Sequence, residues 1–152
     1  MRSFVTITGL LFSAAMLVGC QGAAVTLNAP KAKVQSVEVT ERSDEGSRVL
    51  TTVAVENPNA VVLPLIKASY TVDVEGAGRF RFTEVPGRAL PGEGTQRLDL
   101  PAAFASDESL RGRGYDVTGA VTYRPPGEVE SILYQSGFPL PSTRFRASGR
   151  FE

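Results

Sequence analysis

Composition limits the chemistry that this chain of 152 residues can perform. Its 16 Lys and Arg balance its 16 Asp and Glu, and this formal net charge of zero gives no general attraction for nucleic acid. Histidine is absent and there is one cysteine, which excludes imidazole zinc sites, Ser-His and Cys-His nucleophile pairs, and an internal disulfide. We predict a protein that is not an enzyme and needs no cofactor and no metal.

The N-terminal sequence is typical of an export signal. A basic start at Met1-Arg2 precedes an apolar run over residues 4–18, which is shorter than the ~20 residues that a membrane-spanning helix needs. The run closes on Leu17-Val18-Gly19-Cys20, which resembles the lipobox of bacterial lipoproteins. That resemblance implies that residues 1–19 are a removed signal peptide and that Cys20 carries lipid. The alternative is an ordinary signal peptide beside an unrelated cysteine.

The residues after Cys20 bear on where the protein is held. Gln21 is not the Asp that often signals retention in the inner membrane, so we expect attachment to the outer membrane, facing the periplasm of a bacterial envelope. Residues 20–32 are small and weakly patterned, and we interpret them as the lipidated N-terminus and a tether. The folded domain is then predicted over residues 33–152.

Within that domain, apolar and polar residues alternate with the period of half-buried strands. The inward positions of the predicted strands are Val37 and Val39; Val49, Thr51, Val53 and Val55; Ile66, Ala68, Tyr70, Val72 and Val74; Phe80 and Phe82; Leu98 and Leu100; Tyr115, Val117, Gly119, Val121 and Tyr123; and Phe145, Ala147, Gly149 and Phe151. Turns are predicted at 43–47, 76–78, 86–87, 91–92 and 125–127. About seven strands with almost no helix favour an all-β fold, an antiparallel β-sandwich of the immunoglobulin or fibronectin-III type.

Three segments are less regular. Pro101 is predicted to end its strand. Residues 102–114 suggest one short helical turn capped by Ser106, and residues 129–135 suggest another strand.

One motif departs from ordinary sandwich sequence. Asn57-Pro58-Asn59 follows a strand, and Leu63-Pro64-Leu65 precedes the longest one. The residue before proline is pushed into extended conformation, and proline itself withdraws an N–H from any sheet. An asparagine side chain can then bond to nearby backbone. The motif predicts an abrupt strand end that sends the chain to the other sheet.

The ordered set of motifs resembles the late embryogenesis abundant group 2 family, also called the LEA14-like or WHy domain. The positions that carry the resemblance are Asn57, Pro58, Asn59, Leu63, Pro64, Leu65, Tyr70 and Gly76. It spans about residues 33–152. It implies a sandwich without catalytic residues and a link to desiccation, freezing and osmotic stress, through protection of client proteins or membranes. It also implies that Asn57 and Asn59 shape the fold. The alternative is a chance proline turn in an unrelated sandwich.

Two surface features have both a functional and a structural interpretation. Arg144, Arg146 and Arg150 share one face of the last strand, where they either contact anionic lipid headgroups or protect a sheet edge from aggregation. Phe138-Pro139-Leu140-Pro141, with Phe104 and Tyr134, either forms an apolar lip for a partner or plugs an open end of the sandwich.

Three functional hypotheses follow. The first is a lipid-anchored, non-enzymatic LEA14-like envelope protein that acts in stress tolerance. The second is a lipid- or protein-binding envelope module, a scaffold or a lipid carrier, which a large apolar groove would favour. The third is a carboxylate-dependent hydrolase, although the acids at 44–45, 73, 75 and 107–108 fall in predicted turns, loops or polar strand faces.

Overall fold

The computed structural model describes residues 27–105 and 109–152, which form eight strands and one helix. Their bounds in chain order are β1 (Lys31–Ser43), β2 (Gly46–Glu56), β3 (Leu63–Val74), β4 (Gly78–Glu84), β5 (Ala89–Leu90), β6 (Thr95–Phe104), β7 (Gly114–Tyr123), α1 (Glu128–Gln135) and β8 (Ser142–Arg150).

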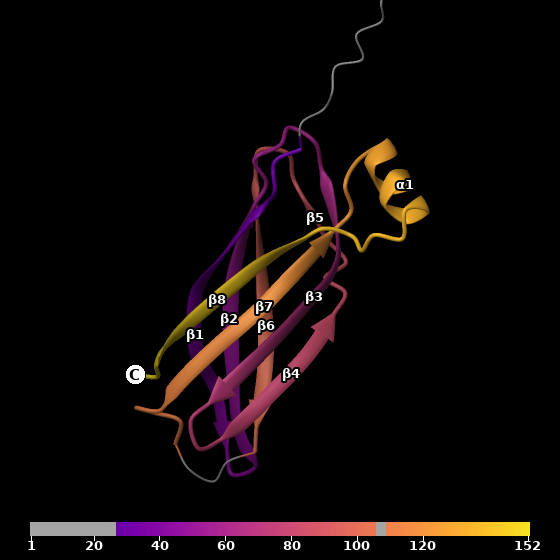
Figure 1. Cartoon of the computed structure of the whole chain (residues 1–152). Coiled ribbons are helices and arrows are strands. Elements are labelled where there is room, and N and C mark those ends of the chain that lie inside the picture. The colour runs from indigo at the N-terminus through magenta and orange to yellow at the C-terminus, as the bar shows by residue number, and fades with distance from the viewer. Residues whose placement is uncertain (1–26, 106–108) are drawn as a thin grey trace, which may run out of the picture.

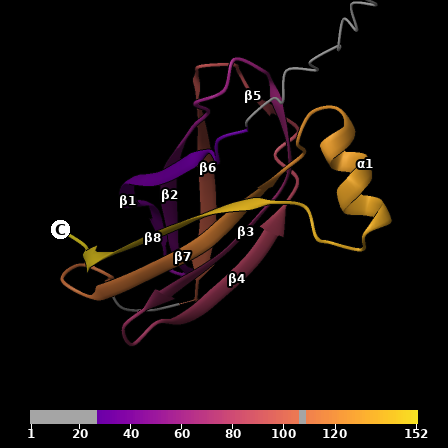
Figure 2. The ribbon, with the colours of Figure 1, turned by 45° about the horizontal axis from the view of Figure 1, so that its top comes forward.

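Two antiparallel sheets pack face to face (Figures 1 and 2). One sheet has the strand order β1-β2-β6, and the other has the order β4-β3-β7-β8 with the two-residue β5 paired to β3. At the two sides of the sandwich, β1 lies against β8 and β4 lies against β6. The predicted antiparallel sandwich is confirmed, with one short helix added.

The core comes from the alternate residues of the facing strands. Val49, Thr51, Val53 and Val55 of β2 are all fully buried, as their alternation predicts. In β3 the inward residues change phase at a bulge between Leu65 and Lys67, so Leu65 and Ala68 both face the core. This extra residue is why Ile66, predicted to face inward, is only half-buried. Three further residues that were predicted inward are exposed because their strands β4, β1 and β8 lie at the edges of the sheets: Phe82 at 46%, Val39 at 38%, and Gly149.

Pro101 does not end its strand, which is a correction. β6 continues through it to Phe104, with Leu50 as the facing residue on β2. β6 is an edge strand, and proline is tolerated where its missing N–H faces away from the neighbouring strand. The Pro101 carbonyl accepts a hydrogen bond from the Tyr70 hydroxyl of the opposite sheet, so this peptide edge points away from β2.

Residues 129–135 are helical, which is the second correction. Val129, Ile132 and Leu133 have the three- and four-residue spacing of a helix, and Glu128 and Glu130 lie in its favourable first turn. Gly137, with a φ of 69°, ends the helix by the usual left-handed turn, in which the N–H of Phe138 bonds to the Leu133 carbonyl.

The domain begins earlier than predicted. β1 starts at Lys31, Pro30 is buried, and Leu27 packs against the core. Residues 27–32, which we expected to belong to the tether, are therefore part of the folded domain. The signal peptide, Cys20 and the expected helical turn at Ser106 lie outside the described residues. None of the described helices is long and apolar enough to cross a membrane.

Candidate functional site

Asn57 is the centre of a compact corner where the chain passes from β2 to β3. Its side chain is 1% exposed, and its amide nitrogen donates to the Val61 carbonyl at 2.8 Å and the Pro91 carbonyl at 3.0 Å. Its backbone N–H donates to the Gly94 carbonyl at 2.8 Å. Asn57 thereby ties the corner to the loop between β5 and β6.

Asn59 fastens the start of the described chain to the same corner. Its side-chain oxygen accepts from the backbone N–H of Asn28 at 2.8 Å, and its amide nitrogen donates to the Asn28 carbonyl at 2.8 Å. The backbone N–H and the amide nitrogen of Asn59 also donate to the side-chain oxygen of Asn57, at 3.0 and 2.8 Å. The Asn59 amide therefore pairs with the Asn28 peptide in the way that a neighbouring strand would.

The corner has no need of left-handed backbone at Asn59. Among the described residues other than glycine, only Glu93 has a positive φ, of 51°, and its N–H donates to the Asn59 carbonyl at 2.7 Å. Gly92 is required beside it, because a Cβ there would lie 2.2 Å from the Ala60 carbonyl oxygen. Every polar group of the Asn57 and Asn59 side chains has an internal partner, which leaves this corner suited to shaping the fold.

The remaining motif residues lie along β3 and its ends. Leu63 and Leu65 are buried, and Pro64 accepts a hydrogen bond from the Arg124 N–H through its carbonyl. Tyr70 is buried and bonds to Pro101 across the sandwich. Desolvation raises the pKa of the Tyr70 phenol well above its ordinary value, and nearby Glu84 raises it further. Gly76 turns the chain with a φ of 71°.

The carboxylates of the described residues form no cluster that could hold a metal ion. No group of three or more Asp, Glu, Cys or His side chains comes together there. Glu84 and Asp99 line one small cavity of about 190 Å³, and the pKa values of their carboxyl groups shift in opposite directions. Burial raises the pKa of Glu84, against the lowering effect of Arg88, whereas the hydrogen bond from Arg97 lowers the pKa of Asp99. Asp99 also accepts from the Thr52 hydroxyl, so its surroundings stabilise a fixed anion.

The three arginines of β8 differ in their partners. Arg146 forms an ion pair with Asp116 at 2.8 Å, and Arg150 donates to the Gly112 carbonyl at 2.9 Å. Arg144 has no ion-pair partner in the described part of the chain, and it lines a shallow trough on the outer sheet face with Arg81. Arg144 is thus the one of the three with neither an ion pair nor a hydrogen bond among the described residues.

The predicted apolar lip does not form as one surface. Tyr134 and Phe138 are 87% and 66% exposed beside α1, whereas Phe104 is buried at the end of β6, next to the turn between β1 and β2. The order of residues in the sequence could not reveal this separation. The last residues of β6 and helix α1 lie at opposite ends of the sandwich (Figure 1).

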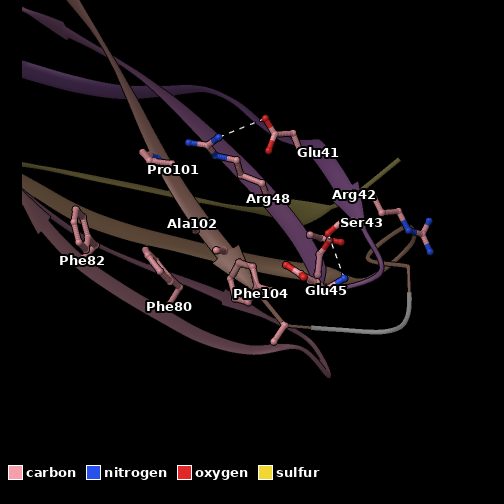
Figure 3. Close-up of a pocket in the computed structure, with 14 residues that line it drawn as sticks. Glu41, Arg42, Ser43, Glu45, Arg48, Phe80, Phe82, Pro101, Ala102 and Phe104 are labelled. Atoms are coloured by element: carbon pink, nitrogen blue, oxygen red, sulfur yellow. Dashed lines mark hydrogen bonds and ion pairs between the residues drawn. The ribbon is translucent and has the colours of Figure 1, made fainter.

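A groove that the sequence did not reveal opens between the edges of β4 and β6. It has a volume of about 890 Å³ and is floored by Phe80, Phe82 and Phe104, with the turn between β1 and β2 at its rim (Figure 3). The rings of Phe80 and Phe104 lie 6.3 Å apart, and those of Phe80 and Phe82 lie 6.0 Å apart. At the rim Arg48 pairs with Glu41 at 3.5 Å. We call this feature the open-edge groove.

Comparison with known structures identifies the fold. The chain is similar to the solution structure of At2g46140.1, described as a late embryogenesis abundant (LEA) protein, with a TM-score of 0.59 and 20% identity over 80% of this chain and 69% of that one. It is also similar to the solution structure of AT1g01470 from Arabidopsis thaliana, with a TM-score of 0.52 and 17% identity over 82% and 83% of the two chains. No family model and no curated protein matches the sequence. The fold of this chain is LEA14-like.

Proposed function

We propose that this chain is a lipid-anchored, non-enzymatic LEA14-like envelope protein that protects proteins or membranes during drying, freezing or osmotic stress. The observation that carries the proposal is the LEA14-like fold over most of the domain. The absence of histidine and the internal pairing of the corner asparagines support a protein that does no chemistry of its own.

Protection is tested with the chain from residue 20 onward, mixed with a labile reporter enzyme before drying or freeze–thaw. Protection that rises toward equimolar ratios and exceeds that of albumin supports the proposal, because a physical spacer acts stoichiometrically. Protection equal to that of albumin would contradict it.

Anchoring is proposed to depend on Cys20, with attachment to the outer membrane facing the periplasm. Two lipid chains suffice for stable membrane attachment, and a fully acylated N-terminal cysteine of a lipoprotein carries more than two. Cys20→Ser should abolish fatty-acid labelling in cells and shift the protein out of the membrane fraction. Unchanged labelling and partitioning of this variant would rule out the lipoprotein assignment.

The open-edge groove favours a second candidate function, the binding of a single acyl chain. Its volume lies in the range of small-molecule sites, about 300–1,000 Å³, and its floor is aromatic. A fluorescent fatty acid should bind the wild-type domain and lose at least ten-fold affinity in Phe82→Glu, which places a charge in the groove. Thr83→Glu is the matched control, since Thr83 pairs with Ser69 on the other face of β4 and β3. Equal binding by both variants would exclude the groove as the site.

A further inference from the structure

Helix α1 projects from the sandwich and leaves apolar side chains in solvent. None of its residues is buried. Arg124, which follows β7, forms an ion pair with Glu130 of the helix at 3.0 Å. Val129 and Ile132 on the helix are 42% and 58% exposed, and Tyr134 and Phe138 are still more exposed. A projecting helix with this much exposed apolar surface indicates a contact with something outside the domain.

The helix stands at the same end of the sandwich as the start of the described chain (Figures 1 and 2). Asn28 is bonded to Asn59 at this end, and the N–H of Arg124, which leads into α1, bonds to the Pro64 carbonyl at the start of β3. We call this end, formed by residues 28–30, 57–64 and 124–141, the N-terminal pole. The turn between β1 and β2 lies at the other pole, at the far end of the 13-residue β1, which spans about 40 Å.

The length of chain before Leu27 decides what this pole can reach. Residues 21–26 separate Cys20 from Leu27, and an extended chain of that length spans at most about 24 Å. A lipid on Cys20 would therefore hold the N-terminal pole close to the bilayer and the other pole far from it. Such tethering gives even a weak contact at this pole a high effective concentration of lipid.

The basic side chains near α1 are compatible with contact to an anionic bilayer. Lys67 of β3 and Arg144 of β8 lie on the outer sheet face in the half nearer to the N-terminal pole, and neither has an ion-pair partner in the described ranges. The acids of that sheet face lie toward the opposite pole, where Asp73 pairs with Arg79 and Asp116 with Arg146. Three exposed acids at this pole oppose the contact, Glu128 on α1 and Glu56 and Glu93 beside the asparagine corner, so the apolar side chains must supply most of the affinity.

We propose that α1 and Phe138 form an interfacial docking surface that lies in the headgroup layer of the bilayer to which Cys20 is attached. Ile132 and Phe138 enter the apolar boundary, and Tyr134 is placed as aromatic residues are at membrane interfaces. This inference rests on the proposed lipid anchor. It adds that the domain is held in one orientation, with the open-edge groove facing away from the membrane.

The chain offers a clean spectroscopic test, because it contains no tryptophan and a single cysteine. The chain from residue 20 onward is coupled through Cys20 to a maleimide lipid in vesicles of phosphatidylethanolamine and phosphatidylglycerol. Phe138→Trp should then show blue-shifted emission and quenching by brominated acyl chains. Asp44→Trp, at an exposed position in the turn between β1 and β2 at the other pole, is the control and should keep the emission of a residue in water.

Ile132→Glu in the Phe138→Trp background should reverse the blue shift without lowering the melting temperature, since α1 buries no side chain. Water-like emission of Phe138→Trp on the vesicles would overturn the proposal. So would a blue shift that needs no vesicles and grows with protein concentration, which would make the surface a contact between copies of the chain. Because the chemical coupling imposes the anchor, these outcomes are independent of whether cells lipidate Cys20.

Discussion

The phenol of Tyr70, on β3, donates a hydrogen bond across the sandwich to the backbone carbonyl of Pro101, on β6. This hydrogen bond joins the two sheets at Pro101, a residue that has no backbone N–H of its own to donate. Tyr70→Phe should lower the free energy of unfolding by about 1–2 kcal/mol, because the carbonyl loses its partner in a partly buried setting. Thermal unfolding followed by circular dichroism measures the loss. Tyr115→Phe is the control, since its hydroxyl has no hydrogen bond in the described structure, and equal stability of the two variants would contradict the prediction.

The Asn59 clamp is expected to stabilise the fold through the backbone of Asn28. Asn59→Val removes the bonds to Asn28 and Asn57 and should cost about 1–3 kcal/mol of unfolding free energy. Asn28→Ala should be nearly neutral, because it is the peptide of Asn28 and not its exposed side chain that is bonded. Hydrogen exchange of the Asn28 amide should accelerate in Asn59→Val alone. Unchanged stability together with a lost binding activity would make the corner a ligand site.

Gly119 is required by the aromatic ring that covers it. A Cβ at this position would lie 2.3 Å from the Phe145 ring and 2.8 Å from the Ser69 carbonyl oxygen. Gly119→Ala should therefore destabilise the domain by about 1–3 kcal/mol, the usual cost of overpacking. In a double-mutant cycle, Phe145→Leu should recover part of that loss, while the backbone contact keeps the rescue incomplete. Strictly additive effects of the two substitutions would show that the ring and the glycine are not coupled.

Glu84 and Asp99 should change stability with pH in opposite directions. The folded pKa of Glu84 is raised by burial, so its contribution to stability grows as the pH falls through that value. Glu84→Gln should raise the melting temperature by about 1–2 °C at pH 7, with the gain vanishing below pH ~4. The folded pKa of Asp99 is lowered by Arg97, so Asp99→Asn should lower the melting temperature at pH 7. Its deficit should disappear as acid protonates the wild-type carboxyl. Parallel pH profiles for both variants would be inconsistent with these environments.

Regular alternation was enough to predict most of the fold. The inward residues of β2 and β7 follow a period of two without interruption, and Asn57-Pro58-Asn59 marks the passage between sheets. The failures have local causes. A bulge after Leu65 changes which face of the sheet Ile66 occupies. Pro101 is tolerated because its strand lies at the edge of a sheet. Three apolar residues within five positions made α1 resemble a short strand.

The functional surfaces were harder to predict than the strands. The partners of Asn57 and Asn59 come from residues 28, 61, 91 and 94, and no local pattern reveals which carbonyls will meet a side chain. The open-edge groove depends on how the edges of β4 and β6 meet at the side of the sandwich, which the twist of the two sheets sets. The exposure of Tyr134 and Phe138 depends on how far α1 stands from the strands.

The strand order also sets how the chain must fold. β2 pairs with β6 and β3 pairs with β7, so each sheet joins an early strand to one that is synthesised some fifty residues later. Neither sheet can close until the second half of the chain is present. Folding should be slow and cooperative for a domain of this size, and a chain cut after β4 should have no stable structure. For the export that we propose, this topology would leave the chain unfolded until its last strand had crossed the membrane.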